Sequence, residues 1–246
     1  MKITPIKTQL FKEREALVPF IKKNIPKLLE ESILVVTSKI VALAEGRTAY
    51  VKNMKEKVQL IKKESQWAMQ TKYVWLTIRD GMVMASAGID ESNANGKLIL
   101  LPEDSFESAA LLRNQLKKIY KIKKLGVVIT DSRLLPLRNG VVGVALGYAG
   151  FKGIKSYLGK PDLFGRKFHF SKTDVADSIA TAAVLTMGEG RERCPLAVIT
   201  NAPIEFVERI SRKELEIDIA EDIYQPLFAK IKKIRIKSKP PLAKRS

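Results

Sequence analysis

The chain of 246 residues has only one cysteine, Cys194, and only one histidine, His169. A single cysteine excludes an internal disulfide and a cysteine-based zinc site, and it fits a reducing, cytoplasmic location. Because Cys194 precedes Pro195 and an apolar strand, we expect a buried, inert thiol rather than a nucleophile. A Ser-His-Asp triad would have to use His169, whose neighbours Phe168 and Phe170 favour a strand position instead.

Long apolar runs and the common nucleotide-binding fingerprints are also absent. No run approaches the roughly 20 apolar residues that span a bilayer, so we expect no membrane association. The first residues, Met1–Pro5, lack a signal-peptide layout. No G-x-x-x-x-G-K-[ST] occurs, and no G-x-G-x-x-G follows a strand. The sequence therefore predicts neither a P-loop nor a dinucleotide-binding fold.

Acidic residues are outnumbered by basic ones, giving a net charge of +18. The segment Lys230–Ser246 carries eight basic residues and no acid, which leaves about +10 on the rest. Such charge attracts nucleotides, acidic substrates or nucleic acid, although composition alone favours a solvated surface and a frayed tail. Pro240 and Pro241 disfavour a helix in the tail. Its basic residues are not interleaved with aromatic ones, so a stacking platform for single strands is not indicated.

What the sequence does contain is three acidic segments, each at the end of an apolar run. They are Ala87–Asn93 with Asp90, Thr130–Ser132 with Asp131, and Met187–Gly190 with Glu189. If the three carboxylates converge, they form a site of hard oxygen ligands for a divalent cation, the usual partner of a nucleoside triphosphate. Taken singly, each is equally an ordinary turn carboxylate.

Apolar periodicity and turn residues predict the order of the secondary-structure elements. Helices are expected over 11–30 with an interruption at Pro26, 57–70, 105–120 and 173–187, and strands over 33–36, 73–78, 82–85, 98–101, 125–130, 141–150 and 196–200. The strand over 125–130 is expected to end on Asp131. Ser38 and Lys39 follow a buried strand directly and can offer hydroxyl, amine and backbone N–H groups to a phosphate. The irregular alternation favours an α+β fold.

The motifs together resemble the coenzyme F-420-0:γ-glutamyl ligase family. They are Val35–Val41 with Ala44–Arg47, Arg79–Gly81, Ala87–Asn93, Leu100–Asp104, Thr130–Ser132, Arg138–Gly140, Asp162–Gly165, Ala176–Asp177 and Gly188–Gly190. The resemblance implies a two-lobed α+β fold with mixed and antiparallel sheets, flanking helices and an intertwined homodimer. The ligase domain would span 1–236, with a lobe boundary near 80–100. The basic tail, 237–246, lies outside every matched motif, so we expect it to be dispensable for catalysis.

The resemblance also implies a GTP- and divalent-metal-dependent ligase. Family members join L-glutamate to a carboxylate of a cofactor precursor, coenzyme F-420-0, through an acyl phosphate. Mg²⁺ or Mn²⁺ is implied, with K⁺ as a further candidate. Carried over by position, the metal ligands are Asp90, Asp131, Ser132 and Glu189, and the GTP contacts are Ser38, Lys39, Asn93, Met187, Gly188, Glu189, Gly190 and Arg191. Arg138 and Asn139 are our candidates for holding an anionic substrate or phosphate at the reacting centre.

The sequence also departs from the family pattern near the phosphates and the substrate. Ala42 and Leu43 stand where the family has serine and lysine, Asp80 replaces a histidine, and Leu137 replaces a tryptophan. Two alternatives therefore stay open: the same ligation on a folate-like pterin, or a basic nucleotide- or nucleic-acid-binding protein without catalysis. Nucleic acid is the less expected partner, because carboxylates lining a groove repel a phosphate backbone.

Overall fold

The structure is a computed structural model that describes residues 1–92, 94 and 96–228. The predicted site residue Asn93 and the basic tail over 237–246 lie outside the described residues. The helices are α1 (Leu17–Asn24), α2 (Ser38–Glu45), α3 (Met54–Glu64), α4 (Ser105–Tyr120), α5 (Val175–Met187) and α6 (Gln225–Phe228), with short 3-10 turns at Ser86–Gly88 and Ile219–Glu221. The strands are β1 (Lys2–Ile6), β2 (Ser32–Thr37), β3 (Thr48–Ala49), β4 (Trp67–Gln70), β5 (Trp75–Arg79), β6 (Met82–Ala85), β7 (Leu98–Ile99), β8 (Leu125–Leu134), β9 (Val141–Ala149), β10 (Ile154–Ser156), β11 (Lys172–Asp174) and β12 (Leu196–Thr200).

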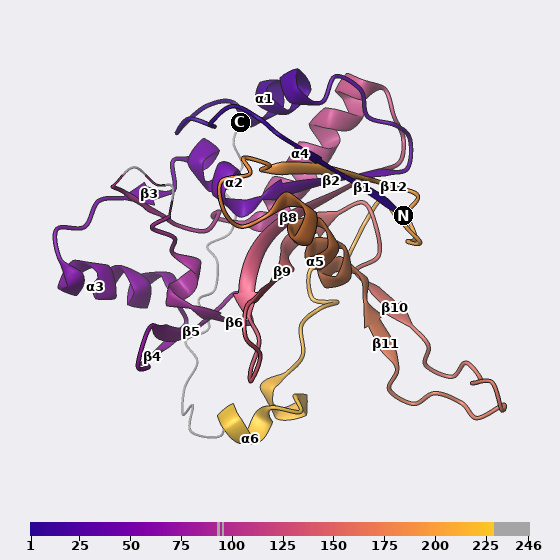
Figure 1. Ribbon diagram of the computed structural model, residues 1–246. Coiled ribbons are helices and arrows are strands. Elements are labelled where there is room, and N and C mark those ends of the chain that lie inside the picture. The colour runs from indigo at the N-terminus through magenta and orange to yellow at the C-terminus, as the bar shows by residue number, and fades with distance from the viewer. Residues whose placement is uncertain (93, 95, 229–246) are drawn as a thin grey trace, which may run out of the picture.

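A five-stranded mixed sheet in the order β1-β12-β2-β8-β9 forms the centre of the molecule (Figure 1). Strands β2 and β8 are parallel, and the other neighbours are antiparallel. Separate antiparallel groups are β4-β5-β6, β3-β7 and β10-β11. The β10–β11 hairpin projects away from the central sheet in Figure 1. The predicted α+β class is confirmed, while the division into two lobes and the dimer stay predictions.

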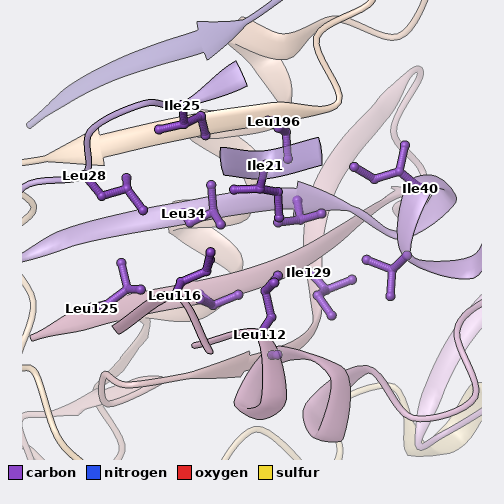
Figure 2. Close-up of a cluster of buried hydrophobic side chains, with 14 of the residues drawn as sticks. Ile21, Ile25, Leu28, Leu34, Ile40, Leu112, Leu116, Leu125, Ile129 and Leu196 are labelled. Atoms are coloured by element: carbon purple, nitrogen blue, oxygen red, sulfur yellow. The ribbon is translucent and has the colours of Figure 1, made fainter. Parts of the chain in front are cut away.

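Both faces of the central sheet are covered by helices. Successive residues of a strand point to opposite faces, and in the central strands both sets are apolar. Leu34 and Val36 of β2 join a core with α1, α2 and α4, whereas Ile33 and Val35 join a second core with α5. Figure 2 shows the first core, where Ile21 of α1 lies among side chains from the sheet and α4. Full burial of each such aliphatic side chain contributes about 1.5–3 kcal/mol.

Strand β9 carries a shift of register that changes which side chains face which helix. Ile129 pairs with Gly147 but the next residue, Thr130, pairs with Ala145, so Leu146 is the extra residue. A one-residue shift sends the following side chains to the opposite face. Accordingly, Gly143 abuts α5, where an added Cβ would lie 2.5 Å from Ala180 O. Gly147 abuts α4, where a Cβ would lie 2.4 Å from the Ser105 carbonyl carbon.

Four details of the predicted elements are wrong. The helix over 11–30 is confined to α1: the predicted break at Pro26 is present, because the ring disfavours helical geometry at Ile25, but residues 11–16 and 26–30 are not helical. The helix over 57–70 ends at Glu64, because Trp67–Gln70 pairs with β5. Strand β8 continues past Asp131 to Leu134, because β9 pairs with it over that length. His169 lies in an exposed bend outside the strands.

Candidate nucleotide and metal site

A cavity of about 690 Å³ opens at the end of the central sheet where β2 finishes and β12 begins. It is lined by every predicted nucleotide and metal residue within the described ranges, namely Ser38, Lys39, Asp90, Asp131, Ser132, Met187, Gly188, Glu189, Gly190 and Arg191. Arg138 and Asn139 do not line it. They lie in the exposed loop between β8 and β9. The structure therefore gathers the predicted binding residues and separates them from the predicted catalytic pair.

The topology explains why segments distant in sequence meet at this end of the sheet. Strands β2 and β8 run parallel, with Thr37 paired to Thr130, so the carboxyl end of β2 brings Ser38 next to Asp131, which lies within β8. In open sheets, ligands bind outside such carboxyl ends. Strand β12 is antiparallel to β2, so it begins where β2 ends. The loop 188–195, which joins α5 to β12, therefore lies at the same end of the sheet. That loop contributes Glu189 and Arg191.

Helix α2 begins at the cavity wall. The Thr37 side chain caps it by accepting a hydrogen bond from Lys39 N, 3.4 Å away. Ser38 and Lys39 are thus the first helical residues, and both line the cavity. The positive end of the helix dipole favours anions at this position. The strand-to-helix junction suits a phosphate group without a glycine-rich loop.

Lys39 bridges to the first acidic segment. Its Nζ lies 2.6 Å from Asp90 Oδ2 and donates to Ser92 O at 3.2 Å and to Ser92 Oγ at 3.1 Å. Asp90 is fixed by paired backbone hydrogen bonds with Ile99, each 2.9 Å long. Burial by itself raises the pKa of Asp90, but the hydrogen bond and charge of Lys39 lower it below its ordinary value. Asp90 is therefore held as a carboxylate.

The second and third acidic segments also meet. Ser132 Oγ donates a short hydrogen bond to Glu189 Oε1. Burial raises the pKa of Asp131 to about 6; the charge of Arg133 opposes this rise, and the like charges of Asp90 and Glu189 add to it. The three carboxylates thus interact electrostatically within one cavity.

Carboxylate and hydroxyl oxygens at Asp90, Asp131, Ser132 and Glu189 are the donor types that Mg²⁺ and Mn²⁺ prefer, so the donor set fits such an ion. In the part of the chain that the structure describes, no three acidic, histidine or cysteine side chains are close enough together to hold one as they stand. Two of the carboxylates are instead engaged by Lys39 and Ser132. For an ion to bind, these two contacts must open, so Lys39 and Ser132 or their carboxylate partners must change rotamer.

One wall of the cavity consists of residues that the motifs do not include. The N-terminal segment Thr8–Phe11 lines it, and Thr8 N donates to Arg193 O at 2.9 Å. No local signal marks this segment. The pairing of β1 with β12, which lies far away in sequence, brings it to the site. Cys194, predicted to be buried, is half-buried and lines the cavity, with its Sγ donating to Glu192 O at 3.5 Å.

The departure at Leu43 falls within the site. Leu43 lines the cavity, so the lysine expected there by resemblance would have faced it. Arg191 and Arg193 line the same cavity, so positive charge is present on the opposite loop. The departures Asp80 and Leu137 do not line this cavity.

Comparison with known proteins gives the family. A model of the family described as F420-0:Gamma-glutamyl ligase matches residues 5–201. The chain belongs to this family. The matched region includes every segment that lines the cavity.

Three curated relatives share the name coenzyme F420:L-glutamate ligase. A protein of Methanococcus maripaludis strain C6 is 36% identical over 172 residues, 69% of this chain and 68% of that one. One of Archaeoglobus fulgidus is 33% identical over 228 residues, 84% of this chain and 91% of that one. One of Methanopyrus kandleri is 34% identical over 190 residues, 70% and 75% of the two chains. No helix in the described ranges is long and apolar enough to cross a membrane.

Proposed function

We propose that this chain is a GTP- and divalent-metal-dependent ligase that joins L-glutamate to a carboxylate of a coenzyme F420 precursor. The observation that carries the proposal is the convergence of Ser38, Lys39, Asp90, Asp131 and Glu189 on one cavity. These residues come from four separate segments, and the family resemblance assigns all of them to nucleotide or metal. The names of the relatives support the reaction class and the acceptor.

The cavity offers what amide formation needs. A carboxylate is a poor electrophile, so it would first take the γ-phosphoryl group of GTP, giving an acyl phosphate and GDP; the deprotonated glutamate amine would then attack the carbonyl carbon and displace inorganic phosphate. The start of α2, with Ser38 and Lys39, would bind the phosphates. Asp90, Asp131 and Glu189 would hold the divalent ion, which neutralises the triphosphate and the charge that develops on transfer. No protein nucleophile is required, which agrees with a site built from carboxylates and cations.

Arg138 and Asn139 need a different placement to take part. In a single chain they are exposed in the β8–β9 loop, away from the cavity. They would serve a substrate there if a second copy presented its loop, and the resemblance implies such a homodimer. We therefore keep them as candidates for substrate binding in the assembled protein.

The test is a product assay with purified protein, L-glutamate, a deazaflavin acceptor lacking glutamate, GTP and Mg²⁺ or Mn²⁺. We expect mass spectrometry to show acceptor enlarged by one glutamate less one water, with one GTP consumed for each amide bond. ATP in place of GTP, and chelation of the metal, should abolish the product. A folate-like pterin acceptor is run in parallel. If product formed only on the pterin, the acceptor would be a pterin and not a deazaflavin. GTP binding without any product would favour the non-catalytic alternative.

A further inference from the structure

We propose that Lys39 couples nucleotide binding to metal binding: without nucleotide it occupies Asp90, and a phosphate group must draw it away before Asp90 can bind an ion. This inference rests on the proposed function, since it concerns the same nucleotide and metal. It adds an order of events that the family resemblance does not contain. The basis is the set of contacts that Lys39 and Asp90 make.

The ammonium group of Lys39 is fully engaged. A lysine ammonium has three N–H donors. Lys39 Nζ has three acceptors, Asp90 Oδ2 at 2.6 Å, Ser92 Oγ at 3.1 Å and Ser92 O at 3.2 Å. Donating to a phosphate therefore requires Lys39 to release at least one of these oxygens.

Asp90 is engaged in the same way. Its Oδ2 faces the ammonium and its Oδ1 accepts from Ser92 N at 2.6 Å. A divalent ion at Oδ2 would lie within a few ångströms of the Lys39 ammonium, and the two positive charges would repel each other. The paired backbone hydrogen bonds with Ile99 hold Asp90 in place, so the lysine must move and not the aspartate backbone.

A bound nucleotide resolves this competition. Lys39 stands in the first turn of α2, beside Ser38, where we place the phosphates. A triphosphate offers the ammonium several anionic oxygens, and the flexible four-carbon stem lets it turn toward them. Asp90 then faces the cavity without its counter-charge. Because coupling between two sites is reciprocal, metal should raise nucleotide affinity by the same factor.

The test compares Mn²⁺ binding by wild type and by Lys39→Met, which keeps most of the aliphatic stem and removes the charge. Free Mn²⁺ is counted by electron paramagnetic resonance, first without nucleotide and then with a GTP analogue that is not hydrolysed; Mn²⁺ held by the analogue alone is measured without protein. Without nucleotide, Lys39→Met should bind Mn²⁺ roughly 10-fold more tightly than wild type. Lys39→Arg keeps the charge and should bind Mn²⁺ as weakly as wild type.

The matched control is Lys57→Met. Lys57 pairs with Glu91, the neighbour of Asp90, but does not line the cavity. Its removal should leave Mn²⁺ affinity within about 2-fold of wild type, since its charge is offset outside the site. Equal Mn²⁺ affinity for wild type and Lys39→Met, or equal shifts for Lys39→Met and Lys57→Met, would overturn the coupling while leaving the proposed function intact. If wild type bound neither Mn²⁺ nor the analogue, the coupling and the proposed function would both be overturned.

Discussion

Asp174 Oδ1 accepts a hydrogen bond from Asp177 N, 2.9 Å away, and so caps the start of α5. Asp177 in turn accepts from Ala145 N of β9 at 2.8 Å. Burial raises the pKa of Asp174 to about 6; the backbone hydrogen bonds oppose this rise, and the nearby charges of Asp177 and Glu214 add to it. The cap that positions α5, which leads into the loop that carries Glu189, is therefore sensitive to pH.

The Asp174→Asn variant should be more stable than wild type at neutral pH and should lose that advantage in acid. The folded state retains the Asp174 proton between about pH 4 and pH 6, where the unfolded chain has released it, so this group's contribution falls as pH rises through that window. Asparagine keeps the capping oxygen and carries no charge. We expect a gain of about 1–2 kcal/mol at pH 7.5 and little at pH 4.5, measured by chemical denaturation.

A change of the same kind at the start of α4 should have the opposite sign. Asp104 also caps its helix, accepting from Glu107 N at 3.0 Å, but it pairs with Arg212 at 2.8 Å. Asp104→Asn should therefore lose up to about 1 kcal/mol at neutral pH. Equal behaviour of the two variants would contradict the assigned environment of Asp174.

The Asp131→Asn variant should lose metal-dependent nucleotide binding and keep its fold. Asparagine retains size and a carbonyl oxygen but removes one ligand charge from the predicted ion site. GTP affinity in Mg²⁺ or Mn²⁺ should fall by roughly 10-fold or more, about 1.4 kcal/mol, as measured by calorimetry. Asp104→Asn, which lies outside the cavity, should leave this affinity unchanged. A crystal soaked in Mn²⁺ with the ion bound away from Asp90, Asp131 and Glu189 would refute the site.

The Gly147→Ala variant should destabilise the fold strongly. Its Cβ would lie 2.4–2.6 Å from the backbone of Ser105 and Phe106, at the start of α4. Backbone atoms cannot turn aside as a side chain can, so we expect a loss of about 1–3 kcal/mol or more. Gly159→Ala is the comparison, because its left-handed φ of +72° strains alanine but nothing lies within 4 Å. A smaller cost at Gly147 than at Gly159, by thermal denaturation, would show that α4 does not pack on β9 as described.

A homodimer is expected from the family resemblance and would bring further residues within reach of the cavity. Light scattering at micromolar concentration should give twice the chain mass of 27.6 kDa. The β8–β9 loop offers the check that matters for catalysis. If Arg138→Ala lowers turnover of the dimer, the loop reaches a substrate, and a monomer of full activity would exclude that role.

The site was predictable from sequence where short segments carry their own geometry. Ser38 and Lys39 follow an apolar β-branched strand, and a strand running into a capped helix needs no distant information. Asp131 lines the same cavity although its strand is longer than predicted. Strand length depends on the partner, and β9 pairs with β8 as far as Leu134. The local sequence preference of residues 125–134 does not determine which strand pairs with them or over what length.

The contacts that decide the chemistry were beyond sequence reasoning. The ion pair of Lys39 with Asp90 joins residues 51 positions apart, and Ser132 meets Glu189 across 57. The wall from Thr8 to Phe11 has no motif at all, and it reaches the cavity only because β1 adds to the edge of β12. The small residues of β9 predicted close packing, but only the register shift shows that they seat α5 at Gly143 and α4 at Gly147.

The antiparallel pairing of β1 with β12 has a practical consequence for making the protein. Ile6 lies opposite Leu196 beside the cavity, whereas Lys2 lies opposite Thr200 at the far end of the strand, about 14 Å away at 3.4 Å per residue. An affinity tag ahead of Met1 therefore emerges remote from the chemistry and can stay in place during assays. Trimming the first eleven residues would remove a cavity wall and bare the hydrogen-bonding edge of β12, which invites aggregation.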